Sequence, residues 1–215
     1  MAKANLSIAD KQTVQIAAPK LRVAEFKLIG TAPYVQLRFS QKAMNAMADK
    51  MKSGTQAKGK KVRAARDFDD DFIQAQHVSE EGWVGVPAGS FRAAMISACR
   101  LVGFKMTLAK LSLFVIADGL DKVDGVPLVK INGTPEPNVM AVRNSTGVAD
   151  LRCRPMWKTW DIKLRLQYDE DQFSLQDISN LLMRVGCQVG IGEGRPDSRM
   201  SSGLGWGLFR LEDKE

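Results

Sequence analysis

Residues 160–186, WDIKLRLQYDEDQFSLQDISNLLMRVG, decide the fold class because a strand pattern runs directly into a helix pattern. The first part, WDIKLRLQY, alternates apolar and polar side chains, which is typical of a half-buried strand. The second part predicts a helix capped by Ser174 and ended by Gly186, since serine is a favoured N-cap and glycine a favoured stop. Four apolar residues at helical spacing predict its inward face: Leu175, Ile178, Leu182 and Val185.

A second packing helix of the same plan is predicted over SFRAAMISACRLVG, with Ser90 as N-cap and Gly103 as C-terminal stop. Its expected apolar stripe comprises Phe91, Ala94, Met95, Ala98, Leu101 and Val102. A third amphipathic helix, SQKAMNAMADKM, is capped by Ser40 and carries Met44, Met47 and Met51 on one face.

Strand patterns flank the two packing helices. They are LRVAEFKLIG, YVQLRFS, KLSLFVIADG, VMAVR, WDIKLRLQY and GLFRL. The order strand, helix, strand occurs twice, which predicts an α+β fold with an antiparallel sheet and a ferredoxin-like (RRM-type split βαβ) core. Inserts at about residues 41–86 and 118–154 interrupt this core, and neither has enough apolar residues to form its own. We therefore expect one domain over residues 1–215, closed by a C-terminal glycine-rich hairpin.

The composition is typical of a folded cytoplasmic protein. Of the 215 residues, 45% are hydrophobic and 26% charged, and no apolar run is long enough for a membrane span or a signal peptide. The cysteines Cys99, Cys153 and Cys187 are far apart, so we expect reduced core thiols rather than disulfides or a zinc site. No metal, no cofactor and no membrane partner is expected.

The charge distribution favours a polyanionic partner. The net charge is +7, and residues 42–66 contain eight basic residues against one acid. Five of these basic residues are candidate phosphate contacts: Lys58, Lys60, Lys61, Arg63 and Arg66. We interpret the acidic run 67–71 as a solvated strip or a partner of the basic run rather than as a metal site. A basic face beside an acidic strip would let copies join head to tail into filaments or rings.

A glycine-rich stretch, VGIGEGRPDSRMSSGLGWGLFRL, occupies residues 189–211. Gly190, Gly192 and Gly194 allow positive φ and a close approach of backbone amides to phosphate, with Arg195 and Arg199 beside them. In the second half, Gly203, Gly205 and Gly207 alternate with larger residues, as in a strand that something packs against. The alternative is a hairpin that only closes the sheet.

This stretch resembles the C-terminal glycine-rich loop of the RAMP superfamily, the ferredoxin-like proteins of CRISPR systems. VGVPAGSFRAAMISACRL, residues 84–101, is similar to the segment in CRISPR effector backbone subunits where a Pro-Gly-Ser turn starts the first core helix. The resemblance implies RNA-binding roles for Pro87, Gly89, Ser90 and Arg92 in the helix-start motif, and for the glycines and Arg195 in the loop. The segments 154–171 and 181–198 also resemble small proteins of tailed phages.

The leading hypothesis is a non-enzymatic protein that binds single-stranded nucleic acid and assembles along the strand. RNA is favoured, single-stranded DNA is the alternative, and other CRISPR-like or phage replication subunits are further possible partners. The competing hypothesis is a RAMP-type, metal-independent endoribonuclease that uses His77, the only histidine. Either would act in the cytoplasm of a bacterial cell or a phage-infected host. Four tryptophans are candidate stacking platforms, although we expect at most one of them to contact a base: Trp83, Trp157, Trp160 and Trp206.

Overall fold

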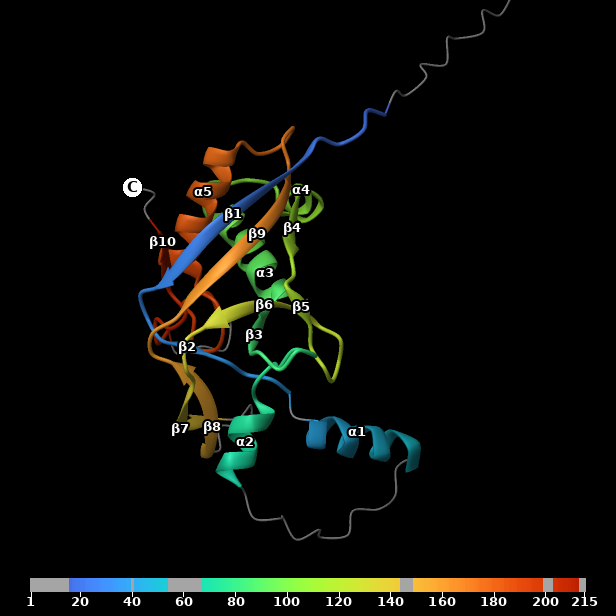
Figure 1. The fold of residues 1–215 in the computed structure, drawn as a ribbon, viewed down its shortest axis with the longest axis vertical. Coiled ribbons are helices and arrows are strands. Elements are labelled where there is room, and N and C mark those ends of the chain that lie inside the picture. The colour runs from blue at the N-terminus through green and yellow to red at the C-terminus, as the bar shows by residue number, and fades with distance from the viewer. Residues whose placement is uncertain (1–15, 40, 54–66, 144–148, 199–202, 213–215) are drawn as a thin grey trace, which may run out of the picture.

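The structure is a computed structural model that describes residues 16–39, 41–53, 67–143, 149–198 and 203–212. It has a mixed α+β architecture built on two antiparallel sheets. The larger sheet has seven strands, and two helices, α3 (Ala88–Cys99) and α5 (Leu175–Arg184), lie behind it in Figure 1. The smaller sheet has the order β2-β8-β7 and lies at the lower end in that view.

Four strands of the larger sheet run side by side in the order β10-β1-β9-β4. They are β10 (Phe209–Leu211), β1 (Leu21–Gly30), β9 (Asp161–Asp169) and β4 (Leu113–Ile116). Helix α3 lies in the chain between β1 and β4, and α5 lies between β9 and β10. Both connections therefore cross over a neighbouring strand, and all three pairings are antiparallel.

The predicted alternation on β9 is confirmed. Ile162, Leu164 and Leu166 are fully buried in the core that contains residues of α3 and α5, whereas Lys163 lies on the open face. Lys163 pairs there with Glu25 of β1 at 2.9 Å. One face of the sheet is thus apolar and covered, and the other is polar and exposed.

Helix α5 has the predicted start but a different end. Ser174 caps it in a capping box with Asp177, and Ile178 and Leu182 are buried, but Leu175 is 53% exposed. The helix does not stop at Gly186, because a π-helical turn, η2 (Val185–Val189), continues it. A Cβ at Gly186 would overlap the carbonyl oxygen of Phe209, so this glycine serves close packing of η2 on β10.

Helix α3 begins earlier than predicted. Pro87 is its N-cap, so Ser90 lies in the first turn rather than at the cap. The inward stripe is confirmed from Phe91 to Ala98, but the predicted residues Leu101 and Val102 are 53% and 50% exposed. The reason is that the chain tightens into a 3-10 turn, η1 (Arg100–Val102), which rotates those side chains outward before Gly103 ends it at φ 69°.

The remaining elements lie mostly in the two inserts. They are β2 (Tyr34–Val35), α1 (Gln41–Ser53), α2 (Phe68–Gln74), β3 (Gly85–Pro87), α4 (Met106–Ser112), β5 (Gly119–Leu120), β6 (Pro127–Asn132), β7 (Glu136–Arg143) and β8 (Ala149–Trp157). Three predicted strands are shorter than expected, since GLFRL also forms a strand only over Phe209–Leu211. The strand predicted from Tyr34 does not include residues 36–39. The strand predicted from Lys110 starts only at Leu113, where the backbone becomes extended, because residues 110–112 belong to α4. Ser40, the predicted cap of α1, lies outside the described residues.

The cysteines differ in their surroundings. Cys99 and Cys153 are buried, and burial raises the pKa of each thiol, so both stay protonated as predicted for core thiols. Cys187 is exposed, which corrects the expectation of a core position. Its place on η2, one residue after the packed Gly186, turns it toward solvent.

Candidate nucleic-acid interface

A groove of about 1220 Å³ runs between the start of α3, the glycine-rich loop that follows η2, and strands β7 and β8. Two segments about a hundred residues apart in the chain meet in it: residues 87–97 and 189–198. The loop reaches this place because it is bonded to the chain around β2: the Glu193 amide donates to Val35 and the Gly207 amide to Pro33. Figure 1 shows this red and orange chain beside β2.

The start of α3 offers free amides to the groove. Its N-cap, Pro87, makes no side-chain cap hydrogen bond, so the first-turn N–H groups lack a capping acceptor. Gly89 is exposed, and a Cβ added there would meet no atom within 4 Å. Ala88, Gly89 and Ser90 all line the groove. An uncapped helix start in open space favours an anion, because the helix dipole is positive there.

The glycine-rich loop presents a second set of amides. Gly190, Gly192 and Gly194 have φ of 71°, 78° and 75°, which confirms the predicted positive φ. The Gly190 amide is used internally, since it donates to Val185 at 2.7 Å. Within the described part of the chain, the amides of Gly192 and Gly194 have no acceptor, and both residues line the groove, Gly192 half-buried and Gly194 buried against Trp206.

The second half of the stretch is not the predicted glycine-lined strand or hairpin. Gly203, Gly205 and Gly207 all have positive φ, between 69° and 72°, so the chain is not extended at these glycines, and a turn is formed at residues 206–207. Only Phe209–Leu211 is a strand, and it pairs with β1. A Cβ at Gly207 would overlap the Ile191 carbonyl, so this glycine permits two backbone segments of the loop to touch.

Two ion pairs hold the loop against the body. Arg154 of β8, whose side chain is 8% exposed, donates to Glu193 at 2.8 Å. Arg100 pairs with Asp197 at 3.0 Å, and Ser97 of α3 also donates to this carboxylate. Both acidic groups of the loop are therefore neutralised, and the loop is fixed at each end of its groove-lining part.

The predicted site residues fall into three groups. Ser90, Gly190, Gly192, Gly194 and Arg195 come together in the groove. Arg92 also lines it, but its guanidinium donates to the carbonyls of Lys110 and Leu113 and packs over the Phe114 ring, so it joins α3 to the end of α4. The others lie outside the described residues: Lys58, Lys60, Lys61, Arg63, Arg66 and Arg199.

Arg195 and Arg152 are the cationic side chains best placed for a ligand in the groove. Arg195 donates one hydrogen bond to the Gly192 carbonyl at 2.9 Å, which leaves other N–H groups of its fork available. Arg152 of β8 lines the opposite wall, with Asp150 at 3.4 Å. Arg152 was not predicted from the sequence, because its segment was assigned to the insert at 118–154 and not to a strand. In a strand, the sequence LRCR would place Arg152 and Arg154 on one face, and this pattern could have indicated the site.

His77 lines the same groove and belongs to a buried polar cluster. Its Nδ1 lies 2.8 Å from Oδ2 of Asp121, and the side chain of Asp121 is fully buried. Arg38 donates to Oδ1 of Asp121 at 3.1 Å and to Asp124 at 3.3 Å. Gln36 fixes the His77 backbone by accepting from its amide at 3.0 Å. His77 is thus held directly by Asp121 and Gln36, while Arg38 holds Asp121 in place.

Asp121 is a carboxylate in this cluster. Burial alone would raise its pKa, but hydrogen bonds from the Val123 amide and His77, with the charge of Arg38, hold the pKa below its ordinary value of 3.8. An ionised carboxylate only accepts, so Nδ1 of His77 must donate to it. In the neutral tautomer that fits this bond, the lone pair lies on Nε2.

The carboxylates of this cluster do not form a ready cation site. His77, Asp121 and Asp124 bring their ligand atoms within 4.8 Å of one another. However, Arg38 binds both carboxylates with the same guanidinium nitrogen and supplies the positive charge that a metal ion would bring. The acidic run 67–71 is not part of this cluster. Asp67 caps α2 and accepts hydrogen bonds from the amides of Asp69 and Asp70.

Only one tryptophan reaches the groove among the four. Trp206 lines it and packs against Gly194. Trp157 and Trp160 are 0% and 4% exposed core residues, and Trp83 is half-buried with its Nε1 donating to Glu81. Of the four tryptophans, the groove thus has one aromatic plane, and two of the other three rings pack in the core.

Within the described residues, none of the helices combines the length and the apolar character that crossing a membrane requires. Comparison with protein-family models gives no match, and a search of curated proteins gives no significant relative.

Proposed function

We propose that the six-element unit β1, α3, β4, β9, α5 and β10 is a ferredoxin-like core of the RAMP type. The support is the strand order β10-β1-β9-β4, with a helix inserted after its first and third strands in chain order. This connectivity is that of the split βαβ motif. The groove then lies where the start of the first core helix meets the loop before the last strand.

The proposed function is binding of single-stranded nucleic acid, with its backbone in the groove. The observation that carries it is the convergence of two sets of unpaired amides, from the uncapped start of α3 and from Gly192 and Gly194. Amide N–H groups bind phosphate oxygens without reading the base. Trp206 supplies a plane on which one base can stack.

Charge in the groove supports the same function. Arg195 and Arg152 line the groove, and Asp150 lies 3.4 Å from Arg152. Glu193 and Asp197, which also line it, are already paired with Arg154 and Arg100. The net charge of +7 would add attraction at long range. The groove therefore offers amides and guanidinium groups to a phosphate, while the two carboxylates that line it are already paired.

The open face of the larger sheet fits nucleic acid less well. The aromatic residues of its two central strands, Phe26 and Tyr168, both belong to the core on the helix side. The cations of the exposed side are paired, including Lys163 with Glu25 and Arg165 with Asp118. The two central strands thus have no exposed ring for stacking, and Phe114 of the edge strand β4, 38% exposed, is already packed against Arg92, so this surface lacks the pair of aromatic residues by which an RRM sheet binds bases.

RNA is the favoured strand, and assembly of several copies along it is part of the proposal. The context would be a CRISPR-like effector or phage nucleic-acid metabolism in the cytoplasm of a bacterial cell. The acidic first turn of α2 provides one pole for such head-to-tail contact, since Asp69, Asp70 and Asp71 lie together there.

Affinity for labelled single-stranded RNA and for DNA of the same sequence, measured over a range of salt, tests the binding proposal. Arg152→Ala with Arg195→Ala should weaken binding and flatten the dependence of log affinity on log salt by about one to two units. Lys27→Ala with Lys163→Ala is the matched control, because it removes the same charge from the open sheet face. Equal effects of the two double variants would contradict the groove.

A second candidate function is RNA cleavage, favoured by the His77–Asp121 pair at 2.8 Å in the wall of the groove. In this reaction Nε2 of His77 takes the proton of a 2′-hydroxyl, whose oxygen attacks the adjacent phosphorus. The P–O5′ bond breaks, water supplies a proton to the 5′ oxygen, and the products are a 2′,3′-cyclic phosphate and a 5′-hydroxyl. Backbone amides of the groove would stabilise the phosphorane oxygens.

Incubation with RNA in EDTA distinguishes cleavage from binding. Cyclic-phosphate products that disappear with His77→Ala, and fall strongly with Asp121→Asn, would support the nuclease. Protection of the strand without cleavage, in a protein that still binds tightly, would leave binding as the function.

A further inference from the structure

The ring of His77 carries a hydrogen-bond acceptor that no other described residue uses. Its Nδ1 is bonded to Asp121, and in the neutral tautomer that fits this bond the lone pair lies on Nε2. Nε2 is not enclosed, because among the described residues only Nε1 of Trp157 is both fully buried and unpartnered. The His77 side chain is 10% exposed and lines the groove. The wall of the groove thus holds a fixed acceptor without a partner.

Two connections place this acceptor beside both sets of groove amides. The His77 carbonyl accepts from the Gly85 amide at 3.0 Å, and Gly85 begins β3, whose last residue, Pro87, is the N-cap of α3. A strand of three residues spans about 7 Å. On the other side, Gln36 accepts from the His77 amide, and the residue before Gln36 accepts from the Glu193 amide of the glycine-rich loop. A strand bound to these amides therefore runs beside His77.

The backbone of a nucleic acid has few groups that can satisfy a lone pair. Its diester phosphates and the ring oxygen of its sugar only accept hydrogen bonds, so the backbone of DNA has no donor. The 2′-hydroxyl of RNA can donate. Within an occupied groove, an acceptor in the wall is therefore satisfied by RNA and left unpaired by DNA. Leaving a desolvated acceptor unpaired reduces affinity by about tenfold.

Neighbouring polar side chains of the groove do not discriminate in this way. Arg152 and Arg195 only donate, so they bind the phosphates of RNA and DNA alike. The Ser90 hydroxyl can donate or accept, so either strand satisfies it. Both ends of the Gln36 amide are engaged by other residues, and the carboxylates of the loop are paired with arginines. His77 differs from all of these in offering an unpaired acceptor.

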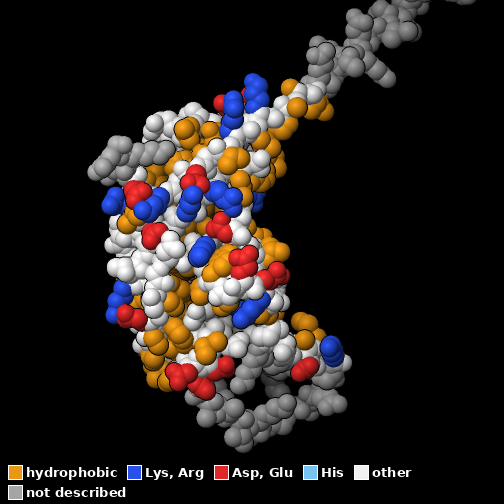
Figure 2. Space-filling view, in the orientation of Figure 1, with side chains coloured by type: hydrophobic (Ala, Val, Ile, Leu, Met, Phe, Trp, Pro, Cys, Tyr) orange, Lys and Arg blue, Asp and Glu red, His pale blue; other side chains and the backbone are white. Residues whose placement is uncertain are grey.

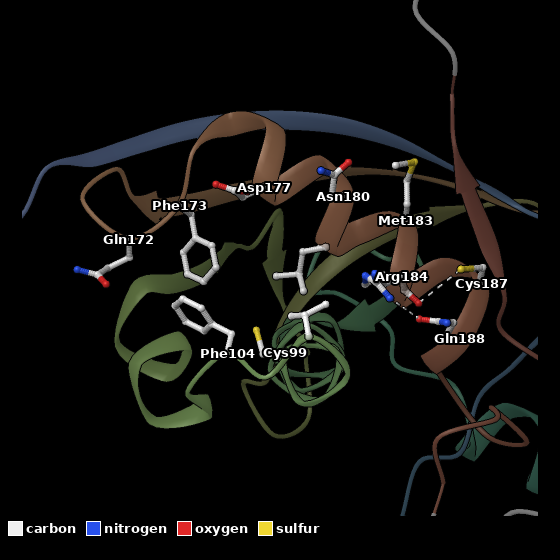
Figure 3. Close-up of a pocket in the computed structure, with 12 residues that line it drawn as sticks. Cys99, Phe104, Gln172, Phe173, Asp177, Asn180, Met183, Arg184, Cys187 and Gln188 are labelled. Carbon is white, nitrogen blue, oxygen red and sulfur yellow. Dashed lines mark hydrogen bonds between the residues drawn. The ribbon is translucent and has the colours of Figure 1, made fainter.

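A second hollow of the molecule lacks this combination. It is a cleft of about 680 Å³ between η1 and α5, and Figure 3 shows Phe104 and Phe173 facing each other at one end, with ring centroids 4.7 Å apart. Its arginine, Arg184, donates to Gln188, as a dashed line in Figure 3 marks. The helix that starts beside it, α5, is capped by Ser174, whereas the start of α3 in the groove is uncapped.

We propose that Nε2 of His77 accepts a hydrogen bond from a ribose 2′-hydroxyl of the bound strand and so makes the groove selective for RNA over DNA. The proposal rests on the proposed binding function and names the residue that selects the strand. It requires no cleavage, because the hydrogen bond alone discriminates between the two sugars. Asp121 acts through His77, since it fixes the tautomer that leaves the lone pair on Nε2.

Three uridine strands of equal length, which differ only at the 2′ position, test the proposal. They are oligouridine, oligodeoxyuridine and 2′-fluoro-oligouridine, whose fluorine keeps an RNA-like sugar but cannot donate a hydrogen bond. The wild-type protein should bind oligouridine about tenfold more tightly than either of the others. Fluorescence anisotropy in EDTA measures the affinities, and a gel run after each titration checks that the RNA is intact.

His77→Asn is the variant that isolates the acceptor. The asparagine amide can still donate to Asp121 from the place of Nδ1, but it has no atom at the place of Nε2. It should weaken binding of oligouridine about tenfold and leave the affinity for the two other strands unchanged. Arg195→Ala is the matched control, because losing a phosphate contact should weaken binding of all three strands by the same factor.

Four outcomes would overturn the selectivity. Equal wild-type affinity for the three strands would remove it and leave the groove standing, and this comparison needs no variant. A preference for oligouridine that persists in His77→Asn would mean that another residue reads the sugar. A 2′-fluoro strand bound as tightly as oligouridine would mean that sugar shape is recognised instead of a donor. No binding of any strand would overturn the binding function as well.

Discussion

Asp121 is the residue on which the polar wall of the groove depends. Its side chain is fully buried, and it accepts from His77, from Arg38 and from the Val123 amide. A buried carboxylate is tolerated because every part of its charge is hydrogen-bonded. The same bonds orient His77, so the stability of the wall and the position of the imidazole depend on one group.

We predict that Asp121→Asn lowers the free energy of unfolding by about 3 kcal/mol at pH 7, because it leaves Arg38 without its buried partner. The native pKa of Asp121 lies below its ordinary value of 3.8, so its stabilisation is present at neutral pH and is lost as the pH falls through the native pKa. Urea unfolding at several pH values should show the gap between wild type and variant closing below about pH 4. A gap of the same size at pH 3 would contradict this role.

The glycines of the loop predict a paired test. Gly205 and Gly207 have nearly the same φ, 72° and 69°, but a Cβ meets nothing at Gly205 and overlaps the Ile191 carbonyl at Gly207. Gly205→Ala should therefore cost only about 1 kcal/mol of backbone strain. Gly207→Ala should cost several times more or prevent folding, as measured by thermal melting. Equal melting temperatures for the two variants would mean that the loop does not pack as described.

Among the elements, α3 has two roles: its inner face packs in the core, and its first turn lines the groove. Its inner face is buried from Ala88 to Cys99, while Pro87 leaves its start uncapped. Arg92, in the second turn, is held by the carbonyls of Lys110 and Leu113. The helix start is therefore fixed in place before any ligand arrives, which lowers the entropic cost of binding.

Arg92→Ala is predicted to reduce stability by about 1–2 kcal/mol, because it removes hydrogen bonds from a charged donor to two carbonyls. Arg100→Ala should cost less than 1 kcal/mol, since that guanidinium is 59% exposed and such surface pairs contribute little. Chemical denaturation of both variants measures the difference. If Arg92→Ala leaves stability unchanged and only RNA binding falls, Arg92 is a ligand contact instead.

The accuracy of the sequence-based predictions differs from element to element. The positions of β1, of α5 and of its Ser174 cap were predictable, because alternation, helical spacing and capping depend on only a few neighbouring residues. The end of α5 was missed because Gly186 is required by Phe209, a residue distant in the chain. The start of α3 was misplaced because serine is a stronger statistical cap than Pro87, yet the pairing of β3 with β6 brings the chain in at Pro87.

The site was predictable only in part for the same reason. Glycine-rich loops and helix starts are visible in the sequence, so Ser90, Gly190, Gly192, Gly194 and Arg195 were found. The partners of His77 were not, because Arg38, Asp121 and Asp124 lie on separate segments that the sheet pairings bring together. Nothing in the local pattern distinguishes Asp121 from the other aspartates.

At the scale of the whole molecule, the groove and the open face of the larger sheet are separate surfaces. The groove lies between α3, the glycine-rich loop and β7–β8. Figure 2 shows basic and acidic side chains interspersed over the sheet side of the molecule rather than one continuous basic field. A strand bound by this protein is thus expected to follow the groove and not the exposed sheet.

Ultraviolet cross-linking of the wild-type protein to single-stranded oligouridine, with the modified peptides identified by mass spectrometry, tests the groove most directly. The account predicts adducts in the segments that line it, residues 87–97 and 189–198, and on Trp206, with loss of these adducts at high salt. Adducts confined to β1 and β9, on the open face of the sheet, would contradict it.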